Sequence, residues 1–134
     1  TLLPLDTDKF TWFHEEYGHQ AGDEVMRAIG DLVHRFRRST DVVGRYGGEE
    51  FGVILPETTA ENAMIFAERL RKRISGTHIV WQSTPLHVTV SIGMSEIRPD
   101  MNDYHAWLSA TDQALYQAKA RGRNQVVNAS SLTS

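Results

Sequence analysis

The sequence has 134 residues, 40% of them hydrophobic and 23% charged, and a formal net charge of −3. These values are typical of one globular domain with its own core, and the absence of cysteine excludes disulfides and thiolate metal sites. The acidic balance argues against binding of duplex nucleic acid, so we expect no DNA partner, and no segment has the pattern of a transmembrane helix or signal peptide.

The first half of the chain predicts a strand, a long helix and a hairpin. Residues 2–5 form a short apolar run that predicts a strand ending at Asp6. Between residues 23 and 38, apolar residues fall on one helical face. Two strand-like runs, residues 42–46 and 51–55, then flank Gly47-Gly48, which is typical of a two-residue hairpin turn with positive φ.

The second half predicts two helices among shorter strands. Thr58 or Thr59 should cap a helix that ends at Ser75-Gly76. Residues 79–81 and 86–92 predict two strands around a turn, and a helix over about 103–120 should close at Gly122. Residues 125–127 predict an edge strand, and the polar tail at 129–134 is expected to fray.

The order of these elements is β-α-β-β-α-β with additions. It predicts an α+β domain over residues 1–128, with a mixed, largely antiparallel sheet flanked by helices in the ferredoxin-like arrangement.

Acidic residues follow two of these elements. Glu49 and Glu50 come directly after Gly47-Gly48, where a bare backbone lets a bulky ligand approach and clustered carboxylates suit Mg²⁺. The alternative is an ordinary hairpin with a solvated acidic end. Asp6 lies where a strand ends and a helix should begin, a place where a carboxylate can hold a metal while helix amides face a phosphate. Judged alone, Asp8 and Asp23 are best interpreted as helix N-caps.

Several motifs occur together in one order: Asp6-x-Asp8-x-Phe10, then Tyr17-Gly18-His19-x-x-Gly22-Asp23, then Arg45-Tyr46-Gly47-Gly48-Glu49-Glu50-Phe51. This series resembles the GGDEF domain family, the diguanylate cyclases. Residues 88–93 and 112–124 resemble a later strand, helix and turn of the same family. The resemblance covers residues 2 to 127 and implies the nucleotidyl-cyclase-like form of the fold.

The resemblance implies a reaction and its machinery. Such enzymes condense two GTP molecules into cyclic di-GMP and pyrophosphate across a homodimer. It implies that Asp6, Glu49 and the backbone carbonyl of Thr7 bind Mg²⁺, with Mn²⁺ as an alternative ion. Glu49 would also be the base for the 3′-hydroxyl, and Glu50 a neighbouring metal or orienting group. Phosphoryl transfer chiefly needs positioning and charge neutralisation, which such groups supply.

The same resemblance assigns the substrate contacts. Gly47 and Gly48 would let GTP lie against the hairpin, and Asp23 would accept hydrogen bonds from guanine N–H groups. Lys119 and Arg123 would meet the terminal phosphates, although cations also favour a helix C-terminus without any ligand.

Arg38-Ser39-Thr40-Asp41 resembles the RxxD inhibitory site of the family, where the product binds. Arg69, on the following helix, lies where related domains offer a further arginine to that ligand. An arginine can pair with phosphate or guanine through two hydrogen bonds.

Two positions depart from the family pattern. Thr11 stands where a phosphate-facing lysine is usual, and His14 stands where a guanine-binding asparagine is usual. His14 remains a candidate substrate contact, but a neutral imidazole offers only one donor and one acceptor. These departures leave open a non-catalytic module that binds GTP or cyclic di-GMP.

The family normally carries a helical segment before the first strand, and the chain starts after it. A sensory region would lie upstream. We expect a cytoplasmic domain whose parent protein can be membrane-anchored.

Overall fold

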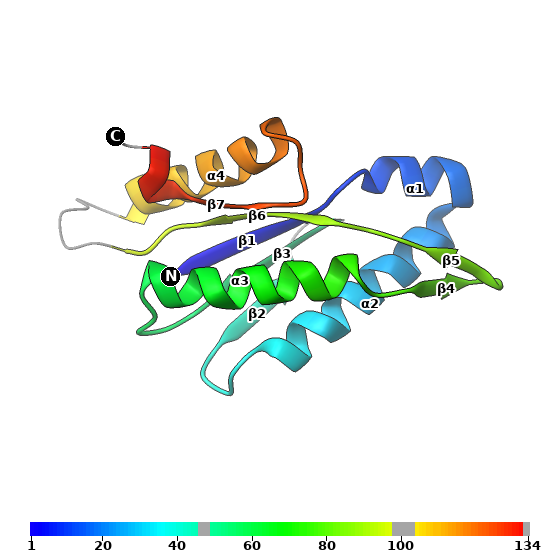
Figure 1. Cartoon of the computed structure of the whole chain (residues 1–134), viewed down its shortest axis with the longest axis horizontal. Coiled ribbons are helices and arrows are strands. Elements are labelled where there is room, and N and C mark those ends of the chain that lie inside the picture. Colours follow the sequence, from blue (N-terminus) through cyan, green and yellow to red (C-terminus); the bar gives the residue numbers. More distant parts are fainter. Residues whose placement is uncertain (46–48, 98–103, 133–134) are drawn as a thin grey trace.

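The computed structural model describes residues 1–45, 49–97 and 104–132. Its main sheet has five strands in the order β2-β3-β1-β6-β7 (Figure 1). Their bounds are β1 Leu2–Thr7, β2 Val42–Arg45, β3 Glu50–Ile54, β6 Val90–Met94 and β7 Val126–Asn128. The central strand β1 is antiparallel to both β3 and β6, and β7 joins the edge parallel to β6. The mixed sheet and the ferredoxin-like order of its first four strands confirm the predicted α+β class.

Helices cover both faces of this sheet. Figure 1 shows α2 (His19–Phe36) and α3 (Ala60–Ser75) on one face and α4 (Tyr104–Ala120) on the other. A short helix, α1 (Phe10–Tyr17), links β1 to α2. Strands β4 (Ile79–Trp81) and β5 (Thr84–Leu86) form a separate hairpin, and a 3₁₀ helix, η1 (Ala129–Leu132), follows β7.

The period of two along the strands divides their side chains between the two faces. Leu3 and Leu5 of β1 are fully buried in the large apolar core with side chains of α2 and α3. Asp6, the residue after Leu5, lies on the opposite, α4 face, where its side chain meets that of Lys119. The sheet therefore has one apolar face for folding and one face with a polar end.

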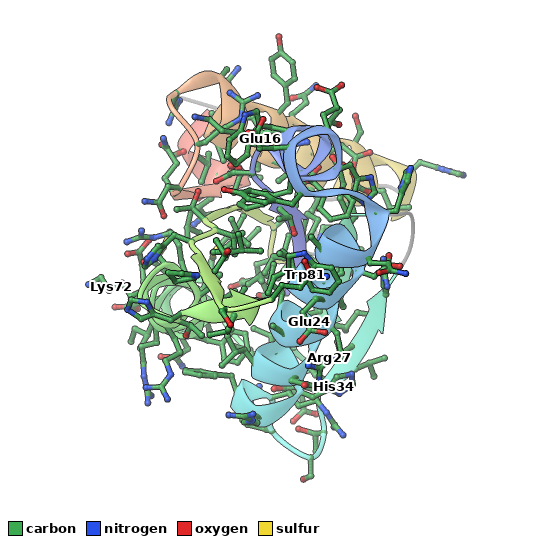
Figure 2. All side chains as sticks on the ribbon, turned by 90° about the vertical axis from the view of Figure 1, so that its right-hand side faces the viewer. Glu16, Glu24, Arg27, His34, Lys72 and Trp81 are labelled. Atoms are coloured by element: carbon green, nitrogen blue, oxygen red, sulfur yellow. The ribbon has the colours of Figure 1, made fainter. Side chains whose placement is uncertain are left out.

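The local signals explain most helix boundaries. Thr59 caps α3, since its side-chain oxygen accepts a hydrogen bond from the backbone N–H of Asn62 at 3.2 Å, and Gly76 follows its last residue. Gly18 separates α1 from α2 with φ of +91°, a conformation that glycine adopts without a Cβ penalty. On the outer side of α2, Glu24, Arg27 and His34 are visible in Figure 2, and the Arg27 guanidinium bonds both Glu24 and Asp31.

Three expectations differ from the structure. Helix α2 begins at His19 rather than near Asp23, because Gly18 already provides the corner. The run 86–92 is not one strand: it divides into the end of β5 and the start of β6, which belong to different sheets. Residues 129–132 form η1 with Ala129 buried against α4 and β7, whereas the polar composition predicts fraying.

None of the helices within the described ranges is both long and apolar enough to cross a membrane.

Candidate active site

Three strands bring acidic and hydroxyl side chains together at one end of the α4 face. In the β-ladders Asp6 lies directly opposite Glu50 on β3 and Ser91 on β6. Asp6 is only 1% exposed. The backbone N–H of Thr7 donates to the carbonyl of Glu49 at 3.0 Å, which fixes the β3 end of the acidic hairpin beside the end of β1. Two regions separated by more than forty residues thus form one carboxylate cluster.

A cation from the far end of the chain completes this cluster. The ammonium of Lys119, in the last turn of α4, forms an ion pair and hydrogen bond with Oδ2 of Asp6. Helix α4 can approach closely because Gly93 of β6 lies beneath it. A Cβ on Gly93 would lie 2.5 Å from the backbone nitrogen of Leu115, well inside ordinary contact. The glycine therefore sets the distance between α4 and the carboxylates.

The electrostatics of the cluster are unbalanced toward negative charge. Burial, followed by the negative charge of Asp6 and a hydrogen bond with it, raises the pKa of Glu49 and of Glu50 above the usual value. Lys119 acts in the opposite direction on both but does not cancel the rise. Raised pKa values of two neighbouring carboxyls mean that the site would gain from further positive charge.

The donor set fits a hard divalent cation. Within the described ranges no group of three or more His, Asp or Glu side chains is arranged as a self-sufficient metal centre. Mg²⁺, however, is commonly held by one or two carboxylates, with the remaining positions filled by water and substrate phosphates. Asp6 and Glu49 match that pattern. The Thr7 hydroxyl is directed elsewhere, since it donates to the sulfur of Met26 on α2 at 3.3 Å, which leaves only its carbonyl for the predicted metal role.

Asp8 is a site residue whose role the sequence did not reveal. It is not an N-cap: Lys9 occupies that position of α1 and makes no side-chain cap bond. The Asp8 carboxylate, 6% exposed, instead accepts hydrogen bonds from the hydroxyls of Thr89 and Ser91, both at 2.6 Å, and from the backbone N–H of Asn124 at 3.0 Å. No local sequence pattern predicts these hydrogen bonds, because the partners of Asp8 are more than eighty residues away along the chain.

Arg123 lies in the turn that follows α4. Its φ is +63°, and its backbone N–H donates to the carbonyl of Ala118 at 2.9 Å, which places it next to the end of the helix that carries Lys119. Its side chain is exposed. The two residues predicted to contact the phosphates therefore both lie at the C-terminal end of α4. Lys119 is partly buried beside Asp6, and Arg123 faces solvent.

His14 and Asp23 come together at the corner between α1 and α2. The His14 ring lies directly over Gly22, where a Cβ would be 2.1 Å from its Cδ2 atom, and contacts the rings of Phe10 and His19. Its Nε2 atom is buried and has no hydrogen-bond partner among the described residues. Asp23 is exposed in the second turn of α2, so the N-cap interpretation of this residue is wrong.

Two further features of the predicted substrate site are Thr11, where a lysine is usual, and the Gly47-Gly48 pair. Thr11 is exposed on α1 and supplies no positive charge. Gly47 and Gly48 lie outside the described residues. The strands on either side place Arg45 opposite Phe51, whereas a simple two-residue turn at Gly47-Gly48 would place Arg45 opposite Glu50.

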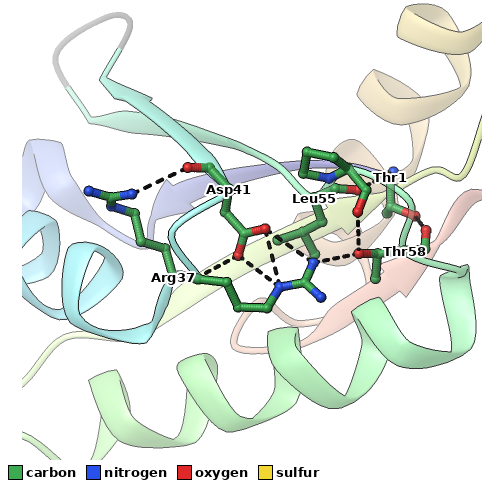
Figure 3. A network of polar contacts seen from close by, with 7 residues as sticks. Thr1, Arg37, Asp41, Leu55 and Thr58 are labelled. Carbon is green, nitrogen blue, oxygen red and sulfur yellow. Dashed lines mark hydrogen bonds and ion pairs between the residues drawn. The ribbon is translucent and has the colours of Figure 1, made fainter.

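The predicted inhibitory residues gather at a second place, between the end of α2 and α3. The buried carboxylate of Asp41 accepts from the backbone N–H of Arg38 at 2.8 Å and from its guanidinium at 3.1 Å. The guanidinium also donates to Thr58, and Figure 3 shows the polar network around Asp41 and Thr58. Arg38 and Arg69 line one cavity of about 260 Å³, together with Phe36 and Phe66, which the sequence analysis did not single out.

Comparison with known proteins now gives this geometry a context. The sequence profile of the family described as "Diguanylate cyclase, GGDEF domain" matches residues 1–125. The chain belongs to the GGDEF domain family. It is 38% identical over 126 residues to diguanylate cyclase A of Treponema denticola, covering 94% of this chain and 34% of that protein. The chain thus spans about a third of that curated relative's length.

Solved GGDEF domains have the same fold. The GGDEF domain of DgcB from Caulobacter crescentus in complex with c-di-GMP matches with a TM-score of 0.89 and 35% identity, covering 96% of this chain and 77% of that one. The active GGEEF domain of a diguanylate cyclase from Vibrio cholerae matches with a TM-score of 0.87 and 31% identity, covering 95% and 80%. The nucleotidyl-cyclase-like fold expected from the sequence is thereby confirmed.

Proposed function

We propose that this GGDEF domain is one half of a diguanylate cyclase, which condenses two GTP molecules into cyclic di-GMP and releases pyrophosphate. The observation that carries the proposal is the cluster of Asp6, Glu49 and Glu50, in which raised carboxyl pKa values coexist with an ion-paired Lys119. A purely structural domain has no need for three carboxylates so close together, because their repulsion opposes folding. A phosphoryl-transfer site does need them.

Each side chain has a role in that reaction. Asp6, Glu49 and the Thr7 carbonyl would hold Mg²⁺, or Mn²⁺ in its place, and the bound ion would neutralise charge on the phosphates of GTP. Lys119 and Arg123 orient the terminal phosphates at the end of α4. Glu49 is the candidate base for the 3′-hydroxyl, and its raised pKa makes it a stronger base than an ordinary carboxylate. Glu50 orients the metal or its water ligands.

The nucleoside part of GTP would lie at the corner between α1 and α2. Asp23 is exposed there and can accept guanine N–H groups. Gly47 and Gly48 have no side chains and would let the nucleotide approach the hairpin. His14 presents its buried, unpartnered Nε2 at the same corner. In place of the usual asparagine, a histidine would make different contacts to the base and would still offer it a polar atom.

The reaction needs a second copy of the domain. Each domain would hold one GTP, so that the 3′-hydroxyl of one nucleotide attacks the α-phosphate of the other across a homodimer. We propose that an upstream sensory region controls this dimer in a cytoplasmic setting where GTP is available. No described feature of the chain favours DNA as a ligand, and the net charge is −3.

A second candidate function is a non-catalytic module that binds GTP or cyclic di-GMP and passes a signal on. Thr11 favours it, because loss of one charged phosphate contact weakens binding by roughly 1.5–3 kcal/mol. The intact carboxylate cluster favours the enzyme. The Glu49→Gln variant distinguishes them: in the enzyme it should lower turnover of GTP by a forced dimer at least about a hundredfold, the scale of general acid–base catalysis. Glu61→Gln, at an exposed position on α3, is the matched control and should leave turnover unchanged.

We further propose that the cavity lined by Arg38 and Arg69 binds the product and inhibits the enzyme. Asp41 holds the Arg38 guanidinium in place, and the Phe36 and Phe66 side chains offer apolar surface to a purine. Arg38→Ala should relieve inhibition by cyclic di-GMP while preserving initial rates. Unaltered inhibition in this variant would exclude the cavity as the inhibitory site.

A further inference from the structure

The turn after α4 has an unfavourable backbone that other residues must hold. Arg123 and Asn124 both have positive φ, +63° and +47°. For Arg123 this left-handed conformation costs about 1–2 kcal/mol, whereas asparagine adopts it more readily. Such a turn is maintained only when its surroundings fix it. Its conformation matters because it sets where Arg123 lies relative to Lys119.

Two side chains hold the turn from opposite sides. Asp8 accepts the Asn124 N–H at 3.0 Å through Oδ2. From α3, the guanidinium of Arg71 donates to Oδ1 of Asn124 at 2.8 Å and is itself paired with Glu68. The turn is therefore anchored both to the end of β1 and to a helix on the other face of the sheet.

Asp8 is itself held firmly. Its Oδ1 accepts from Ser91 and its Oδ2 from Thr89, both at 2.6 Å, in addition to Asn124. A buried carboxylate with three donors is strongly oriented, and none of its partners carries a net charge. It lies two residues after Asp6, so the same strand end fixes both the Lys119 partner and the turn.

We propose that Asp8 is a positioning residue for the polyphosphate part of the substrate. It holds the turn at residues 121–124 so that Arg123 is presented beside Lys119, and it does not touch the nucleotide. This inference rests on the proposed function, because it assumes that the end of α4 meets the terminal phosphates of GTP. It also separates two groups of substrate contacts. Asp8 controls the contacts to the β- and γ-phosphates and has no influence on the contacts to the base.

The test compares nucleotides that differ only in phosphates. Asp8→Ala removes both carboxylate oxygens, so the hydroxyls of Thr89 and Ser91 and the backbone N–H of Asn124 all lose their acceptor. Affinities for GTP and GMP are measured with Mg²⁺ by calorimetry on the folded variant. We expect GTP binding to weaken by about tenfold to a hundredfold, the usual effect of residues that orient a binding group, and GMP binding to stay unchanged.

A second variant covers the case in which Asp8→Ala does not fold. Arg71→Ala releases the turn from the α3 side without altering the buried carboxylate, and it should also weaken GTP binding with no effect on GMP. Arg73→Ala, at an exposed position two residues further along α3, is the matched control and should change neither affinity. Equal weakening of GTP and GMP in the two test variants, or no weakening, would overturn the positioning role.

Amide hydrogen exchange separates this inference from the proposed function. In Asp8→Ala the N–H of Asn124 should lose protection while amides of the β1–β3 ladder keep theirs. Retained protection at Asn124 would overturn the inference even if nucleotide affinity changed. If the wild-type protein bound neither GTP nor GMP, the proposed function would fail, and the phosphate role of Asp8 would fail with it.

Discussion

Replacing Gly93 by alanine tests whether the close contact between α4 and the sheet builds the site. The added Cβ would lie 2.5 Å from the Leu115 nitrogen, 2.9 Å from the Leu115 Cα and 3.0 Å from the Ala114 carbonyl carbon. Ordinary contact begins at 3.4 Å, so the helix must move by 3.4 − 2.5 = 0.9 Å along the closest direction. These neighbours are helix backbone, which cannot rotate away.

Overpacking a core usually costs 1–3 kcal/mol, and a clash with backbone belongs at the upper end, about 3 kcal/mol. For a domain of this size that loss lowers Tm by roughly 10 °C. The displacement also draws Lys119 away from Asp6, so affinity for GTP should fall together with stability. Urea unfolding and nucleotide titration measure the two effects.

The matched control is Gly44→Ala on β2. A Cβ at Gly44 would meet nothing within 4 Å, and its φ is not positive. It should be neutral or slightly stabilising, because alanine reduces the entropy of the unfolded chain. If Gly93→Ala changed the free energy of unfolding by less than about 0.5 kcal/mol, the typical effect of a neutral surface change, the contact would not control the position of α4.

Three further predictions concern other parts of the site. Gly22→Ala should destabilise the domain by about 1–3 kcal/mol because its Cβ would overlap the His14 ring, and His14→Ala should remove most of that loss in a double-mutant cycle. Without metal, Glu49→Gln should be more stable than wild type at neutral pH, since a carboxyl with a raised folded-state pKa favours folding only at low pH and loses that contribution as pH rises. The difference should vanish as the pH falls toward the ordinary value of 4.5, and Mg²⁺ should stabilise the wild type more than the variant. Arg69→Ala should weaken binding of cyclic di-GMP in a titration while leaving Mg²⁺-dependent stabilisation unchanged; equal loss of both would contradict two separate sites.

Much of the fold could be predicted because it depends on local signals. The apolar stripe of α2, the Thr59 cap and the glycine after α3 each act within a few residues, and each predicted helix exists. The start of α2 differs from the prediction because a single glycine at position 18 makes the corner, whereas the predicted helix begins only near residue 23. The strand run at 86–92 was misassigned because β-propensity does not show where a chain passes from one sheet to another.

The candidate site likewise contains residues that local motifs predict and roles that depend on the tertiary fold. The motifs predict Asp6, Glu49, Lys119 and Arg123 as site residues, and the structure brings Asp6, Glu49 and Lys119 together. The role of Asp8 was not predictable, because a carboxylate after a strand has the local pattern of an N-cap. Only the packing of β6 and the final turn against β1 gives it three donors. The sequence does not predict the Lys119–Asp6 pair either, since it indicates only a phosphate contact or a cation at a helix C-terminus for this lysine.

The most direct test of the central claim is turnover of GTP by a forced dimer of this domain with Mg²⁺. The two domains are fused to a parallel coiled coil, because the isolated domain can be monomeric and silent. Nucleotides are then separated and quantified over time. We expect one cyclic di-GMP and two pyrophosphates for every two GTP consumed, with no product when Glu49 is replaced by glutamine. Tight binding of GTP without any cyclic di-GMP would contradict the enzyme and establish the binding module.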